Sequence, residues 1–177
     1  MKSVLAFTAL CLASAPALAG PDAFHPGSVI PDYGNVATID TTIAPPENPR
    51  LSFDVSAAAE AGELNRTLVS AARYINMNAE AGIDPATISV AVVVHGGAVR
   101  DVANAETYAS AHDGAENANA ALIAALIENG VHIYVCGQSA AYYDVATEDL
   151  LPGVDMALSA MTAHTMLQQQ GYAINPF

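Results

Sequence analysis

Three residue types suited to chemistry stand at the ends of apolar segments of this chain. Asp54, His95 and Cys136 each lie at the end of an apolar or alternating run that predicts a strand, or directly follow it. Carboxylate, imidazole and thiol groups serve proton transfer and nucleophilic attack in proteins. In an open parallel sheet, ligands bind beyond the carboxyl ends of the strands. We therefore predict a functional site at these strand ends, although an aspartate after a strand also commonly caps a turn.

Cys136 is the reactive group on which this site would centre. The other cysteine, Cys11, lies in an N-terminal segment that we expect to be removed, so an intramolecular disulfide is excluded. Gly137 permits a sharp turn into a helix, whose first N–H groups would favour a thiolate. Asp54 on a neighbouring strand would oppose that shift by like-charge repulsion. A buried cysteine that acts as a small apolar residue is the alternative.

Small and polar residues follow the same strand ends and complete the predicted pocket. They are Gly96, Gly97, Gly137, Gln138 and Ser139. We expect His95 to order the glycine turn beside it or to line the pocket.

A serine hydrolase is a minor alternative. The segment GQSAA is close to the G-x-S-x-G elbow, and Ser139, Asp155 and His164 follow one another in Ser–Asp–His order. However, the last elbow position is Ala141, and Asp155 stands at the start of an expected strand, the wrong end of the sheet. Both departures count against this function.

Metal and cofactor sites are not indicated. The histidines have no i, i+4 or short-loop clustering, so we predict no metal site within the chain, while a copper or zinc site shared between subunits stays open. They are His25, His95, His112, His132 and His164. No Ser/Thr-rich phosphate loop follows the first strand, which disfavours flavin. We predict no cofactor.

The net charge of the chain excludes further classes of binding partner. The 177 residues hold 5 Lys and Arg against 18 Asp and Glu, a net charge of −13. Nucleic acids and anionic lipids are bound through clustered Lys and Arg, so we predict partners of neither kind. No stretch of the expected mature chain is long and apolar enough to span a membrane.

The N-terminus predicts export. Lys2, an apolar run over residues 4–13 and the sequence Ala17-Leu18-Ala19 form a signal peptide over residues 1–19, cleaved after Ala19. The protein would then be periplasmic or secreted. Residues 20–49 hold six of the ten prolines and form an extended leader. The α/β domain would occupy residues 50–177.

Periodicity in that domain predicts strands alternating with helices. Strands are expected over residues 51–55, 88–94, 131–135, 154–158 and 172–174. Helices are expected over 63–78, from Asn117 or Asn119 to Asn129, and from Ser159 to Gln170. The fold class is α/β, a three-layer α/β/α sandwich around a mostly parallel five-stranded sheet.

Four segments resemble the DsrE/DsrF-like sulfur-relay family. They are HGGAV, GVHIYVCGQSAA, LLPGVDMALSAMTA and QGYAINPF, and the resemblance runs from Arg50 to Phe177. It implies a YchN-like sheet ordered 2-1-3-4-5 and a homotrimer or homohexamer. It also implies that Cys136 is the cysteine that accepts and passes on persulfide sulfur. In that order, His95 and Cys136 lie two strands apart, about 10 Å at the usual strand spacing.

The sequence therefore predicts an exported DsrE-like protein that carries sulfur on Cys136. Its partners would be a sulfur donor and an acceptor, either a protein or a small thiol. The alternative is a non-catalytic oligomeric protein of the periplasm that binds a small molecule. Thiol reactivity distinguishes the two, because a carrier thiol must be reachable.

Overall fold

The computed structural model describes residues 20–176, and the signal peptide predicted for residues 1–19 lies outside them. Five parallel strands form one sheet in the order β4-β3-β2-β1-β5. The strands are β1 (Arg50–Val55), β2 (Ser89–Val94), β3 (His132–Cys136), β4 (Val154–Ala157) and β5 (Ala173–Asn175). The predicted α/β class and five-stranded parallel sheet are confirmed.

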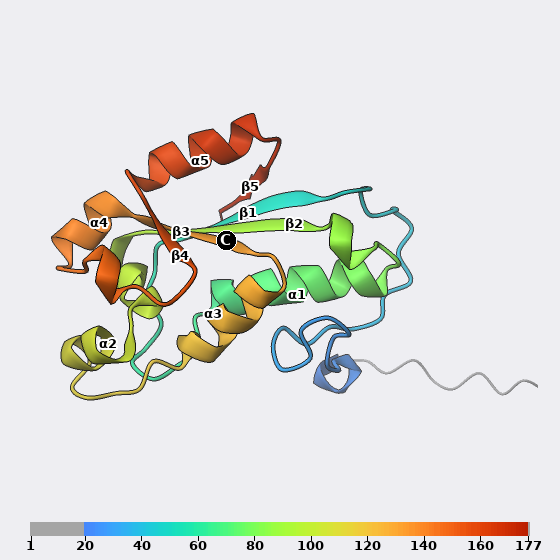
Figure 1. The fold of residues 1–177 in the computed structure, drawn as a ribbon. Coiled ribbons are helices and arrows are strands. Elements are labelled where there is room, and N and C mark those ends of the chain that lie inside the picture. The colour runs from blue at the N-terminus through green and yellow to red at the C-terminus, as the bar shows by residue number, and fades with distance from the viewer. Residues whose placement is uncertain (1–19, 177) are drawn as a thin grey trace, which may run out of the picture.

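Helices cover both faces of the sheet, which gives three layers (Figure 1). Helices α1 (Arg66–Glu80) and α3 (Asn119–Glu128) lie on one face, and α5 (Ala160–Gln169) lies on the other. Two short helices, α2 (Ala105–Ala111) and α4 (Gly137–Tyr142), lie toward the carboxyl end of the sheet. Short 3-10 segments cover Gly20–Ala23, Pro85–Thr87, Gly96–Val102 and Thr147–Asp149. Among the described residues, no helix is long and apolar enough to cross a membrane.

The strand order 2-1-3-4-5 expected from the family resemblance is wrong. Strand β2 lies between β1 and β3, whereas the expected order placed it at an edge. The physical reason is its composition, because Val90 to Val94 are buried on both faces, as a central parallel strand requires. Strands β2, β3 and β4 are added one after another on one side of β1, and β5 then pairs with the other side of β1. Right-handed crossovers put α5 on the face opposite α1 and α3 when the direction reverses.

Side chains of β2 alternate between two cores. Val92 and Val94 belong to the main core with residues of α1 and α3. Ala91 and Val93 pack with Ala163 and Leu167 of α5. This period of two decides which residues at the strand ends face α5.

The proline-rich leader is packed on its own domain through Asn76 of α1. The Asn76 carboxamide is buried; it accepts a hydrogen bond from the Ile30 amide (2.9 Å) and donates to the carbonyls of Ile30 and Tyr33 (3.0 Å each). Gly34 has a φ of +68°, and a Cβ there would overlap the backbone of Arg73. The leader thus binds one face of α1 with little regular structure of its own, a 3-10 segment at Gly20–Ala23 and a bridge between His25 and Val36.

Helix α2 and the 3-10 segment Gly96–Val102 were not expected from the sequence. Helix α2 has seven residues, buries Tyr108 alone and is capped by the Asn104 side chain, which accepts from the Thr107 amide at 3.0 Å. So short a helix leaves little periodic signal. The expected first helix also starts three residues later than predicted, because Asn65 caps it at Arg66.

Candidate functional site

The three residues predicted at the strand ends lie on the same face of the sheet, under α5. Phe53 and Val55 point to the main core, so Asp54 between them points to the α5 face. By the same alternation, His95 follows Val93 on that face, and Cys136 follows Tyr134. The sequence-based prediction that these three strand ends form one site is consistent with this arrangement.

The spacing of His95 and Cys136 differs from the expected one. Val94 of β2 pairs with Val135 of β3, so His95 and Cys136 are the next residues on neighbouring strands, about 4.8 Å apart along the sheet. The expected separation of two strands followed from the wrong strand order. Instead, β2 separates Asp54 from Cys136, and His95 lies between them.

Hydrogen-bond donors surround the Cys136 thiol. Burial raises the pKa of Cys136, but hydrogen bonds with the Ser139 hydroxyl and with the amides of Ser139, Ala160 and Gln138 outweigh it and lower the pKa overall. Two of these residues lie in the first turn of α4, and Ala160 is the first residue of α5. The lowering comes from fixed dipoles, with no contribution from Asp54, so the expected opposition by that carboxylate is absent.

Gly137 and Gly96 allow close contact between backbone segments of the site. A Cβ on Gly137 would lie 2.8 Å from the Ala157 carbonyl oxygen, so only glycine lets α4 begin directly beside Cys136. Gly96 has a φ of +55°, and a Cβ there would lie 2.8 Å from the Ser56 carbonyl oxygen. Gly97 meets only ordinary contacts, the nearest at 3.7 Å, so nothing in its surroundings demands a glycine.

Two hydrogen bonds join the strand-end loops. The Gly96 amide donates to the Ser139 hydroxyl oxygen at 3.0 Å, which ties the residue after His95 to a residue that hydrogen-bonds with Cys136. The Gln138 side chain donates to the Leu158 carbonyl at 3.2 Å and fastens α4 to the segment before α5. Both predicted residues therefore hold the site together.

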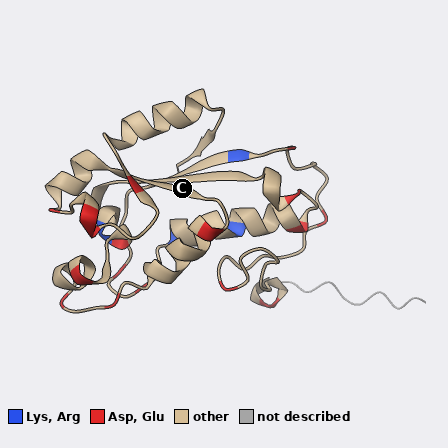
Figure 2. Cartoon of the chain, in the orientation of Figure 1, with Lys and Arg blue, Asp and Glu red and all other residues tan. Residues whose placement is uncertain are grey.

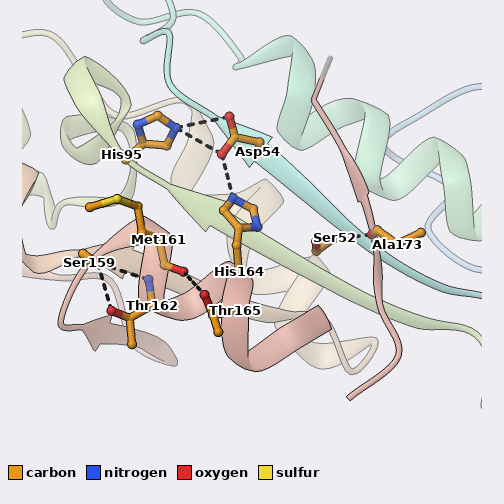
Figure 3. Close-up of polar contacts among 9 residues, drawn as sticks. All are labelled: Ser52, Asp54, His95, Ser159, Met161, Thr162, His164, Thr165 and Ala173. Atoms are coloured by element: carbon orange, nitrogen blue, oxygen red, sulfur yellow. Dashed lines mark hydrogen bonds and ion pairs between the residues drawn. The ribbon is translucent and has the colours of Figure 1, made fainter. Parts of the chain in front are cut away.

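Asp54 is held between two imidazoles (Figure 3). The Nε2 atom of His164 lies 2.7 Å from Oδ1, and Nε2 of His95 lies 3.1 and 3.2 Å from the two carboxylate oxygens. Burial raises the pKa of Asp54, but the bonds from His164 and His95 outweigh it and lower the pKa overall. Asp54 therefore stays ionised and directs the Nε2–H of both rings toward itself.

Sequence reasoning did not include His164 in this site. It lies one helical turn after Ala160, and 110 residues separate it from Asp54. The available signal was the i, i+4 spacing from the expected start of the last helix, which places His164 on the same helix face as Ala160. Pairing with Asp54 follows only from the fold of α5 back over the sheet.

The serine hydrolase arrangement does not form. The Ser139 hydroxyl bonds with Gly96 and Cys136, His164 bonds with Asp54, and Asp155 is exposed on β4. Between residues 20 and 176, no group of three His, Cys, Asp or Glu side chains has the arrangement of a metal site.

Arginine side chains do not contribute to the site in the described part of the chain. The four arginines of the described chain are scattered over other parts of the surface (Figure 2). Arg50 donates to the Gln170 carbonyl at 3.0 Å, Arg73 to the Asn35 carbonyl at 2.9 Å, and Arg100 stacks over the Tyr143 ring. The site is therefore built from amide, hydroxyl and imidazole donors.

Comparison with known proteins agrees with this fold. Residues 40–176 match the DsrE/DsrF-like family, a match that begins inside the proline-rich leader. The fold is similar to that of MTH1491 from Methanobacterium thermoautotrophicum, a protein described as of unknown function. The TM-score is 0.54 at 19% identity over 73% of this chain and 99% of that chain. No curated protein matches this chain.

Proposed function

Because this chain belongs to the DsrE/DsrF-like family, which is associated with sulfur relay, we propose that it carries sulfane sulfur as a persulfide on Cys136. The observation that supports the proposal is the ring of donors around Cys136, which lowers the pKa of the thiol despite its burial. A thiolate is the form of cysteine that attacks sulfur.

The transfer needs no oxidant or reductant. The Cys136 thiolate attacks the outer sulfur of a donor persulfide, R–S–SH. The donor S–S bond breaks, Cys136–S–SH forms, and the donor leaves as a thiolate that takes up a proton. An acceptor thiolate then attacks the outer sulfur, and Cys136 leaves as a thiolate stabilised by the same donors. One cysteine is enough, since no resolving thiol takes part.

Intact mass of the loaded protein tests this proposal. The reduced protein, residues 20–177, is treated with glutathione persulfide, and a gain of one sulfur atom on Cys136 is expected. Cys136→Ser should gain none. Absence of any gain in the wild-type protein would overturn the carrier function.

The burial of Cys136 favours a second candidate function. The residue is only 5% exposed, as expected for a structural cysteine beside a small-molecule pocket. Alkylation of the folded protein by iodoacetamide separates the two functions. A carrier thiol reacts at a rate comparable to that of a free thiolate, whereas a structural thiol reacts only after denaturation. Resistance to both alkylation and sulfur loading would establish the binding protein instead.

We further propose that the protein is exported and forms a homo-oligomer. Export is supported by the charged, apolar and Ala-x-Ala pattern of residues 1–19, and a trimer or hexamer by the family resemblance. The exported form should begin at Gly20 by intact mass. The molar mass of that form by light scattering should exceed the monomer mass. A monomer mass at micromolar concentration would overturn the proposed oligomer.

A further inference from the structure

We propose that His95 is the proton donor to the thiolate that leaves when Cys136 is loaded, and that Asp54 and His164 position it. This inference rests on the proposed sulfur-carrier function and assigns the acid that completes the transfer.

Placement supports His95 as the group beside the reacting sulfur. Val94 of β2 is paired with Val135 of β3, and His95 and Cys136 are the residues that come directly after them. Both side chains point to the same face of the sheet. The Gly96 amide bonds to the Ser139 hydroxyl, which itself bonds with Cys136. The residue after His95 is therefore linked to the Cys136 thiol through the Ser139 hydroxyl.

The two imidazoles bound to Asp54 differ in what their second nitrogen can reach. Both rings use Nε2 for Asp54. The Nδ1 atom of His164 is buried without a hydrogen-bond partner, and the side chain is 14% exposed. The His95 side chain is 30% exposed, and its Nδ1 is not among the buried atoms without partners. Of the two, His95 is the ring that can exchange a proton with a bound substrate.

Asp54 gives the His95 ring a fixed orientation. A carboxylate that accepts from Nε2 holds the ring in place and stabilises the positive charge when Nδ1 also takes up a proton. His164 donates to the same carboxylate at 2.7 Å and keeps it in position from the α5 side. Asp54 and His164 therefore act through His95 and are positioning residues.

The step balances as a proton-coupled exchange. The Cys136 thiolate attacks the outer sulfur of R–S–SH, the S–S bond breaks, and the leaving RS⁻ takes the Nδ1 proton of the His95 imidazolium. The products are Cys136–S–SH, RSH and neutral His95, which stays neutral until sulfur is delivered and regains its proton then. In delivery, neutral His95 accepts the proton of the acceptor thiol as that thiol attacks.

The leaving thiol supplies a test that separates acid catalysis from a structural role. An alkyl thiolate such as that of glutathione needs a proton to leave, whereas a weakly basic aryl thiolate leaves without one. Single-turnover loading is followed by rapid quench and mass spectrometry with glutathione persulfide and with an aryl persulfide. His95→Gln should slow loading from glutathione persulfide roughly a hundredfold and leave loading from the aryl persulfide nearly unchanged.

The pH profile provides a second readout. Loading of the wild-type protein needs a thiolate and an imidazolium, so the rate should rise and then fall with pH. His95→Gln should lose the falling limb. Asp54→Asn should slow loading roughly tenfold, and the double variant should be no slower than His95→Gln alone, because Asp54 acts through His95. The matched control is His132→Gln, an exposed histidine on the same strand as Cys136, which should load as the wild type does.

The outcomes distinguish this inference from the proposed function. If the wild-type protein takes no sulfur from either donor, the carrier function and this inference both fail. If the wild type loads and His95→Gln loads equally fast, or is slowed equally with both donors, only the role of His95 fails. Iodoacetamide alkylation of Cys136 at the wild-type rate in His95→Gln would show that the thiol site is intact.

Discussion

Asp54 and Asp101 are two aspartates near the carboxyl ends of β1 and β2, yet their surroundings differ. Asp54 is 27% exposed and is bonded by two imidazoles. Asp101 is 1% exposed, and one of its carboxylate oxygens accepts from the Ala59 amide at 2.9 Å and from the Asn65 side chain at 2.7 Å. Its other oxygen is buried without a partner.

The difference shows how the partners of a carboxylate separate a structural role from a chemical one. Burial raises the pKa of Asp101, and the bonds from Asn65 and Ala59, together with the electrostatic effect of His112, only partly offset it. The groups that hydrogen-bond to Asp101 are amides, which cannot exchange protons, so Asp101 serves to hold the loop after β1 against the segment after β2. The partners of Asp54 are imidazoles at the carboxyl ends of the strands, and one of them, His95, is exposed enough to exchange a proton with a ligand.

The largest effect on stability should come from Asp101→Ala. Removal of the carboxylate leaves the Ala59 amide and one N–H of the Asn65 side chain without an acceptor, while the Asn65 amide still donates to the Ala57 carbonyl at 2.9 Å. We expect a loss of about 2–4 kcal/mol in the free energy of unfolding, and a Tm lower by roughly 5–15 °C. Urea denaturation measures the former. The exposed Asp155→Ala is the control and should change it by less than about 0.5 kcal/mol. A loss for Asp101→Ala no larger than that of the control would contradict the structural role.

The pH dependence of stability should have opposite signs at the two carboxylates. The pKa of Asp54 is lowered, so its contribution is present above about pH 4, the value in the unfolded chain, and is lost as pH falls through the folded value. The pKa of Asp101 is raised, so the cost of burying its charge is relieved as pH falls from 7 toward about 4.

Neutral variants make this contrast measurable. Relative to Asp54→Asn, the wild-type protein should lose stability below about pH 4; relative to Asp101→Asn, it should gain stability between pH 7 and about 4. Urea denaturation from pH 3 to 7 tests both. Differences that change in the same direction would mean that the two carboxylates do not differ as the structure indicates.

Asp54→Asn should itself have a small effect on stability. The side chain is partly exposed, and asparagine keeps one oxygen that can accept from an imidazole. We expect a loss of less than about 1 kcal/mol at pH 7 by urea denaturation, together with the slower sulfur loading given above. A loss as large as that of Asp101→Ala would make Asp54 a structural residue.

His112→Phe should give the smallest change. The Nε2 atom of His112 is buried without a hydrogen-bond partner, and its ring lies 4.3 Å from the Tyr108 ring. Phenylalanine keeps the ring contact and removes the unpaired nitrogen, but it also removes the favourable electrostatic interaction of His112 with Asp101, so we expect stability within about 1 kcal/mol of the wild type. Sulfur loading should be unchanged. Slower loading would mean that this region also serves the Cys136 site.

Local signals in the sequence were sufficient for most of the elements. The β-branched run before His95 forms β2, and Ser159 caps α5, with its hydroxyl accepting from the Thr162 amide at 3.1 Å. Gly130 and Gly171 follow α3 and α5 with φ values of +80° and +86°. Each signal acts within a few residues, which is why it can be seen without the fold.

The sequence by itself determined that a carboxylate, an imidazole and a thiol end three strands, because alternation and composition mark those strands locally. Tertiary structure alone decided that His95 lies between Asp54 and Cys136, since strand order depends on which strand is buried on both faces. It also decided that His164 joins Asp54 across 110 residues and that the Ala160 amide reaches Cys136. Both contacts arise because the return from β4 to β5 carries α5 over the face on which the three strand ends point.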